Sequence, residues 1–196
     1  AQGGVAAVWD KTADNLQKHI SDTLSTGDGL CREDIVRLVV ENGPDRLKEI
    51  ISWGAKFDAE LGREGGHTAN RILHHKDITG RELMRTLMEK AQTFSNITMH
   101  NSYFALDYIT QHHLGHQITR VTDNIECYGC YALNRNTGRI ETILSRVTVC
   151  ASGGIGHVYK TTTNPLVATG DGIAMVYRAK GRVEDMEFVQ FHPTAF

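Results

Sequence analysis

The apolar residues of this 196-residue chain change their spacing near residue 92, and this change limits the chain to a mixed fold. Residues 12–26 and 33–52 carry apolar side chains three or four positions apart, which predicts two amphipathic helices. Gly43-Pro44 is expected to interrupt or kink the second helix, because proline removes a backbone donor. A third helix is predicted over residues 79–92. Thr79 is its expected cap, and Glu82 completes a capping box.

After residue 92 the pattern changes to alternation, which is typical of strands in a small antiparallel sheet. The expected strands cover residues 97–100, 104–111, 116–122, 126–134, 139–144 and 145–150. Asn136-Thr137-Gly138 fits the turn of a hairpin, and residues 171–180 fit a short helix that ends at Gly181.

The composition favours a small-molecule function. With 196 residues, of which 40% are apolar, the chain can form one domain with a hydrophobic core. Its net charge of -2 gives no broad positive electrostatic field that would attract nucleic acid or an anionic membrane. No apolar run approaches the roughly 20 residues that span a bilayer, and no signal peptide is recognisable, so we expect a cytoplasmic protein. Four cysteines are too few for a disulfide framework at this length.

The segment of residues 55–78 has no sustained period and reads as a functional loop. Arg63, Glu64 and His67 lie within five residues, with two glycines between them. Opposite charges beside a titratable imidazole are costly to bury without a purpose, although a solvated charged loop explains them equally well.

Two glycine-rich segments could approach a flat ligand. Gly154-Ile155-Gly156 is followed by Tyr159 where a nucleotide-binding G-x-G-x-x-G run needs its third glycine, so this fingerprint fails. What remains is a glycine pair at 153–154 after a buried strand, or simply a tight turn. Asp171 stands between Gly170 and Gly172 and is placed to cap the following helix through backbone N–H groups.

An amide and an imidazole share one face of the last segment, residues 186–196. If this run is extended, alternation directs Phe188, Gln190 and His192 the same way, and Pro193 then ends the pairing. An ordinary edge strand with a satisfied histidine is the alternative.

Two further patterns carry less weight as metal or disulfide sites. On a regular strand, Cys127 and Cys130 point to opposite faces, so a shared metal or disulfide needs a bulge at Gly129. His112, His113 and His116 lack the glutamate of a zinc-binding H-E-x-x-H helix. We therefore expect no metal.

Several runs, taken in order, resemble the flavoprotein family of succinate dehydrogenase, fumarate reductase and L-aspartate oxidase, and the resemblance covers the whole chain. Within this family, Arg-Glu-Gly-Gly-His and His-Pro-Thr-Ala are most similar to the L-aspartate oxidase branch. The matching runs are residues 1–4, 63–67, 71–74, 79–81, 162–165, 170–175 and 186–196.

The resemblance implies an α/β (mixed α+β) fold. It would be part of a Rossmann-like FAD-binding domain with an inserted antiparallel sheet, here without its N-terminal βαβ unit. Residues 1–187 would form the partial FAD-binding domain, and residues 188–196 the first part of a capping domain that holds the substrate. The chain would thus be an internal fragment.

The resemblance also implies FAD as cofactor. Gln2, Gly3 and Gly4 match a segment beside the flavin ring, Ala105 and Leu106 match backbone at the adenine end, and the counterpart of Asp171 contacts FAD.

The implied reaction is oxidation of L-aspartate to iminoaspartate, with hydride transfer to flavin N5 and reoxidation by oxygen or fumarate. Glu64 would meet the substrate ammonium group, while Gln190 and His192 would hold a carboxylate. The family's catalytic arginine would lie beyond Phe196. The product would feed NAD synthesis, with quinolinate synthase as a candidate partner.

Two alternatives stay open at this point. The first is a flavoprotein subunit of fumarate reductase or succinate dehydrogenase, which shares the hydride chemistry. The second is a non-catalytic module that kept the scaffold.

We predict that these 196 residues alone bind FAD weakly or not at all, because the strand, turn and helix that hold the ADP half are missing. Gel filtration after incubation with FAD tests this, with absorbance followed in the flavin band. A stoichiometric yellow complex would contradict the prediction.

Overall fold

The computed structural model describes residues 3–191 and divides into two compact units, residues 1–98 and 99–196. Both units mix helices with antiparallel strands, which agrees with the predicted fold class. Gln2 and His192 lie outside the described residues. Within residues 3–191, no helix is both long and apolar enough to cross a membrane.

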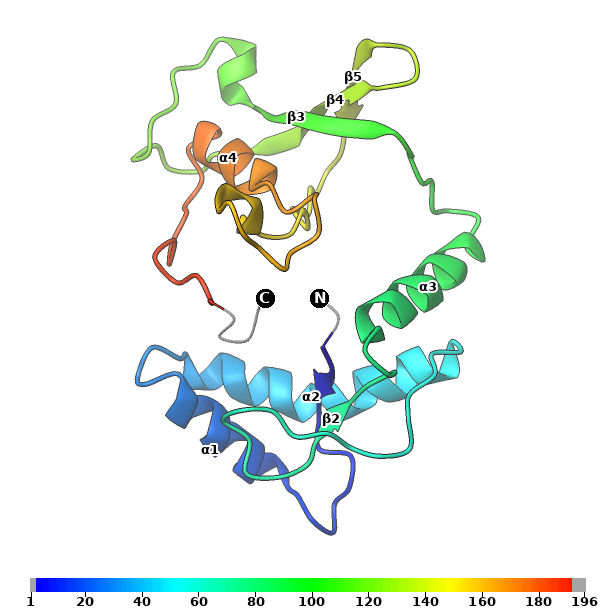
Figure 1. Cartoon of the computed structure of the whole chain (residues 1–196). Helices are drawn as coiled ribbons and strands as arrows, with labels where there is room; N and C mark the ends of the chain where they lie inside the picture. The colour runs from blue at the N-terminus through cyan, green and yellow to red at the C-terminus, as the bar shows by residue number, and fades with distance from the viewer. Residues whose placement is uncertain (1–2, 192–196) are drawn as a thin grey trace. The chain divides into compact units, whose positions relative to one another are not determined.

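The first unit packs helices around a minimal sheet (Figure 1). β1 (Val5–Ala6) pairs antiparallel with β2 (Ile72–Leu73). The helices are α1 (Leu16–Thr26), α2 (Glu33–Ser52) and α3 (Thr79–Gln92), which confirms the three predicted helices. Ala7, Leu47 and Leu73 form a buried cluster that joins β1, α2 and β2.

The helix termini differ in detail from the sequence prediction. α2 runs through Pro44 as a single helix, so the predicted interruption is wrong, while a kink at this position stays a prediction. α3 has no side-chain cap, because the Thr79 hydroxyl accepts from the His75 amide at 2.9 Å. The Glu82 carboxylate accepts from the Lys56 amide and from Arg85 instead. Two local partners, His75 and Arg85, and one distant partner, Lys56, thus replace the predicted capping box.

The second unit is built on a three-stranded antiparallel sheet in the order β3-β4-β5. Its strands are β3 (Tyr103–Thr110), β4 (Cys127–Asn134) and β5 (Arg139–Leu144), as predicted to within a few residues. α4 (Asp171–Arg178) packs against β3. Two short 3-10 helices, η1 (Gln111–Leu114) and η2 (Gly156–Val158), lie in the connections.

Three predicted strands do not form. Residues 97–100, 116–122 and 145–150 have no strand assignment, and the Val147 and Val149 side chains are 77% and 80% exposed. A strand is stable only when a neighbour satisfies its N–H and C=O groups. Within residues 3–191, these segments find no such neighbour.

The sheet contains the irregularity that a Cys127–Cys130 pair would need. Thr110 faces Cys127 and Ile109 faces Gly129, so Tyr128 is an extra residue in β4. Gly129 has φ 138°, and all four cysteines of the chain are free thiols.

Gly129 and Gly138 both have positive φ, but only Gly129 is crowded. A Cβ on Gly129 would lie 2.0 Å from the Ile143 carbonyl oxygen, whereas a Cβ on Gly138 would meet no atom within 4 Å. We therefore expect Gly138→Ala to cost about 1 kcal/mol of unfolding free energy, for backbone strain alone. Gly129→Ala should cost about 3 kcal/mol or more, because the strand must also shift. Urea denaturation measures both, and equal losses would contradict the packing argument.

Candidate functional site

The loop that carries Arg63 and Glu64 is closed at its base by main-chain hydrogen bonds. Gly62 and Ile72 form an isolated antiparallel bridge, in which the Gly62 amide donates to the Ile72 carbonyl at 2.9 Å. The Ile72 amide donates back at 3.0 Å. Because Ile72 belongs to β2, the loop of residues 63–70 projects from the small sheet of the first unit.

Within this loop, residues 64–67 form a tight turn. The His67 amide donates to the Glu64 carbonyl at 3.3 Å, and Gly66 between them has φ 81°. A positive φ at the third residue is what a type II turn requires, and glycine adopts it without strain. A Cβ on Gly66 would also lie 2.7 Å from the Thr26 hydroxyl, so the turn approaches the end of α1 closely.

Arg71 anchors the end of the loop to the interior of the unit. Its side chain is fully buried, and Nε and Nη2 donate to the two Asp14 carboxylate oxygens at 2.7 and 2.8 Å. Nη1 donates to Asp22 on α1 at 2.5 Å. The hydrogen bonds that Arg71 donates to Asp14 and to Asp22 raise the pKa of Arg71 despite its burial. The guanidinium is therefore permanently charged and doubly paired.

Asp22 also holds the loop directly. It accepts from the Thr68 amide at 2.9 Å and from the Thr68 hydroxyl. Burial by itself would raise the pKa of Asp22, but the hydrogen bonds from Thr68 and Arg71 outweigh it and lower the pKa to about 2. The carboxylate is thus ionised at neutral pH and joins α1, Thr68 and Arg71.

The predicted substrate residue Glu64 lies beside a predicted cofactor residue. Its Oε1 is 3.6 Å from the position that a Cβ on Gly3 would occupy. Both Glu64 and Arg63 are exposed within this chain, so the Glu64 carboxylate is open to a ligand. The structure therefore brings together two residues that are about sixty positions apart in the sequence.

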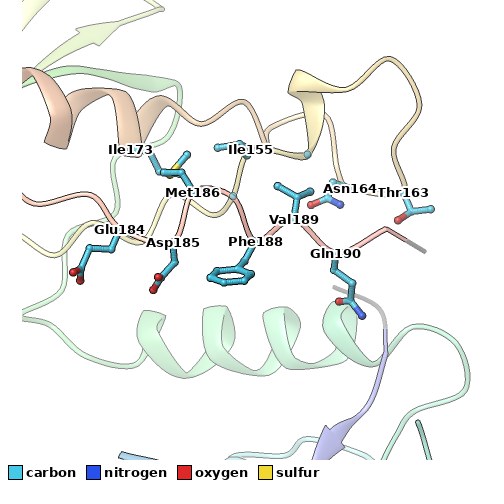
Figure 2. A pocket seen from close by; sticks show the side chains of 12 residues that line it. Ile155, Thr163, Asn164, Ile173, Glu184, Asp185, Met186, Phe188, Val189 and Gln190 are labelled. Atoms are coloured by element: carbon cyan, nitrogen blue, oxygen red, sulfur yellow. The ribbon is translucent and has the colours of Figure 1, made fainter. Parts of the chain in front are cut away.

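In the second unit, the glycine-rich segments line a cavity of about 480 Å³ (Figure 2). Gly154 and Gly156 form part of one wall, and Asn164 lies close to them, because a Cβ on Gly156 would be 2.5 Å from its Cγ. The predicted substrate residue Gln190 also lines this cavity. Ile173 lines it too, so the runs 162–165, 170–175 and 186–196, on which the family resemblance rests, meet at this cavity.

The segment before Gln190 contains turns and is not a strand. Turn-like hydrogen bonds join the Phe188 amide to Asp185 and the Val189 amide to Glu187, and residues 186–191 pair with no strand among residues 3–191. The predicted strand is therefore wrong in its described part. Figure 2 still shows Phe188 and Gln190 on one side and Val189 on the other, as alternation predicts. His192, expected on the Gln190 side, lies outside the described residues.

Asp171 begins α4 but does not cap it. The N-cap is Gly170, with φ 79°, and no side chain makes a capping hydrogen bond. The Asp171 carboxylate accepts instead from the Thr169 hydroxyl. The Gly170 amide donates to the Gly154 carbonyl at 3.1 Å, which places Asp171 next to the glycine pair. The cap prediction is wrong, and a role toward a cofactor stays a prediction.

Ala105 lies on β3 next to an irregularity in the sheet. The register shifts between Ala105 and Asp107, which leaves Leu106 outside the regular pairing with β4. Arg178 of α4 uses this gap, because its Nη2 donates to the Leu106 carbonyl and its Nε to Asp107, each at 2.7 Å. The contact fixes α4 against the backbone that is expected to meet the adenine end of FAD.

Three of the glycines have open space where a side chain would stand. Among residues 3–191, no atom lies within 4 Å of a Cβ placed on Gly153 or Gly154, and only Glu64 lies that close to one on Gly3. Open backbone of this kind can approach an aromatic ring and donate hydrogen bonds to it. The open backbone at Gly3 in the first unit, and at Gly153 and Gly154 in the second, is in each case compatible with the approach of a flat ring. The roles of Gly3 and Asp171 toward FAD stay predictions.

Comparison with known proteins defines the class. Residues 1–196 match the family described as FAD binding domain, and the chain belongs to this family. The prediction of FAD as the cofactor is thereby confirmed. Over its full length the chain is 46% identical to the chloroplastic L-aspartate oxidase of Oryza sativa subsp. japonica. Over 99% of its length it is 46% identical to L-aspartate oxidase 1 of Ralstonia nicotianae.

The chain spans about a third of the length of these relatives, 30% of the rice protein and 37% of the Ralstonia protein. Among solved structures, it is similar to an E. coli quinol fumarate reductase chain, with a TM-score of 0.80 and 30% identity. That match covers 91% of this chain and 29% of the fumarate reductase chain. The Mycobacterium smegmatis protein Sdh1 is similar at a TM-score of 0.79 and 29% identity, over 91% of this chain and 31% of that one.

Sequence reasoning missed the residues that hold the loop in place. Asp14 and Asp22 stand on or near a helix and Thr68 in the loop, and none of the three belongs to a motif that the sequence analysis used. The available signal was eight-residue spacing of two acids near α1, together with an arginine directly before the apolar β2. That pattern does not identify a partner 49 residues away.

Asp22→Asn should lower the free energy of unfolding by about 3 kcal/mol at pH 7, because it leaves a buried guanidinium with one partner fewer. The exposed pair partner Asp34 is the matched control, and Asp34→Asn should cost less than about 0.5 kcal/mol. Because Asp22 has a depressed pKa, its contribution is fully present above pH 4 and is lost as the pH falls toward 2. Urea denaturation at pH 7, 4 and 3 should show that the difference in free energy of unfolding between the wild type and Asp22→Asn decreases. A difference that does not depend on pH would contradict this.

Proposed function

We propose that the whole protein is an FAD-dependent L-aspartate oxidase, which oxidises L-aspartate to iminoaspartate. One observation carries the proposal: the Glu64 carboxylate lies at the Gly3 backbone, in the segment expected beside the flavin ring. An exposed carboxylate at that place favours a substrate with an ammonium group over a plain dicarboxylate, because opposite charges attract and like charges repel. The names of the rice and Ralstonia relatives support the same substrate.

Each residue has a defined task in this reaction. Glu64 binds and orients the ammonium group, which must lose a proton as the C–N double bond forms. Gln190 and His192 hold a substrate carboxylate, the first as an amide donor and the second as an imidazole donor. When bound, FAD accepts the hydride that leaves Cα. This chain supplies positioning and charge, which is where much of the rate enhancement in such sites originates.

The remaining assignments belong to the same proposal. Residues 1–187 form part of the FAD-binding domain, residues 188–196 begin a capping domain, and Gln2, Ala105 and Asp171 contact FAD. Oxygen or fumarate reoxidises the flavin, and the fumarate reductase likeness supports fumarate. The product passes to quinolinate synthase for NAD synthesis, and the protein acts in the cytoplasm.

The competing function is a fumarate reductase or succinate dehydrogenase flavoprotein subunit, which the similar solved structures favour. Turnover by the whole protein separates the two. Consumption of L-aspartate with formation of peroxide supports the oxidase. Succinate or fumarate activity without L-aspartate oxidation supports the alternative.

Glu64→Gln in the whole protein should raise KM for L-aspartate at least about tenfold, which corresponds to loss of about 1.4 kcal/mol of charge attraction. Fumarate reduction should change less than about twofold, because fumarate has no ammonium group. Glu60→Gln, a change at an exposed acid on the same segment, is the matched control and should leave both activities unchanged. Steady-state kinetics with both substrates tests this, and equal losses on the two would assign Glu64 a structural role.

A further inference from the structure

His67 connects the Glu64 turn to the buried ion cluster. Its backbone amide closes the turn on the Glu64 carbonyl at 3.3 Å, and its ring Nδ1 lies 3.0 Å from Arg71 Nη1. Arg71 cannot adjust to a movement of the turn, because it is fully buried and holds Asp14 and Asp22 at the same time. The position of the His67 ring therefore determines where the turn, and with it Glu64, can lie.

The contact with Arg71 fixes the protonation of His67. A guanidinium has only donors, so Nδ1 must offer its lone pair. The ring is then neutral, with its proton on Nε2. Protonation of Nδ1 would replace the acceptor with a second donor facing a permanent cation, and the hydrogen bond would be lost.

The other groups around His67 do not offset such a change. The His19 ring on α1 is 5.7 Å away, and burial lowers the pKa of His19, which keeps it neutral. The negative charges nearby are Asp14 and Asp22, and both are already engaged by Arg71. Asp22 also accepts from Thr68. A positive charge on the His67 ring would thus lie beside the Arg71 cation, with no unpaired carboxylate among these groups to balance it.

We propose that His67 is a positioning residue for Glu64: as a neutral imidazole accepting from Arg71, it holds the turn that presents the Glu64 carboxylate to the substrate ammonium group. The inference rests on the proposed function for its substrate. Loss of this acceptor releases the turn, so recognition of L-aspartate weakens while recognition of a dicarboxylate without an amine does not.

Two substitutions separate this role from simple packing. His67→Asn places an amide oxygen near the position of Nδ1, so it still accepts from Arg71. His67→Phe keeps a ring and removes the acceptor. In the whole protein we expect the ratio of KM for L-aspartate to KM for fumarate to be about tenfold higher in the Phe variant than in the wild type, which corresponds to about 1.4 kcal/mol.

The Asn variant should keep the low ratio of the wild type, because it retains the acceptor. A ratio in the Asn variant that equals that of the Phe variant would overturn the proposal.

Two further readouts do not depend on turnover. ¹⁵N spectra of the histidine-labelled protein should show His67 in the Nε2–H form at pH 7.5, assigned by its disappearance in the Asn variant. Trypsin should cut after the exposed Arg63 several times faster in the Phe variant than in the wild type or the Asn variant. A proton on Nδ1, or equal cleavage rates in all three, would refute the role of His67. Absence of L-aspartate oxidation combined with the expected tautomer and cleavage rates would instead refute the proposed function.

Discussion

The paired charges of Arg71 with Asp14 and Asp22 are the interaction on which the first unit's site depends. A fully buried guanidinium is tolerated only when its donors are satisfied, and here two carboxylates and an imidazole meet them. Because the acids lie on or before α1 and the arginine enters β2, the cluster fixes the helix to the strand. This contact between helix and strand also determines the position of the loop of residues 63–70.

In the second unit, close approach of backbone segments, rather than ion pairing, fixes α4 in place. A Cβ on Gly172 would lie 2.0 Å from the Ser152 hydroxyl, and one on Gly170 would lie 2.7 Å from Ile155. Glycine at both positions lets the start of α4 touch the segment of residues 150–156. Arg178 secures the other end of the helix at the irregular part of β3. The cavity that contains Gln190 lies beside this packed junction.

Helix periodicity and hairpin signals located α1 to α4 and β3 to β5 well, because these elements satisfy most of their hydrogen bonds locally or with a sequence neighbour. Residues 145–150 have the composition of a strand, but strand formation depends on a partner that composition cannot supply. The caps failed for a related reason. Glu82 accepts from the Lys56 amide and from Arg85, and Asp171 accepts from the Thr169 hydroxyl, so neither carboxylate bonds to the first amides of its own helix.

The sequence by itself determined the mixed fold class, the family resemblance, and the candidate residues Glu64, Gln190 and His192. It could do so because residue types and their spacing record local structure and the chemistry of a site. Only the tertiary structure decided that Glu64 faces Gly3, and that Arg71, Asp22 and His67 hold its turn. Those contacts join residues tens of positions apart, and a distance of that kind is set by how helices and strands pack, which local spacing does not encode.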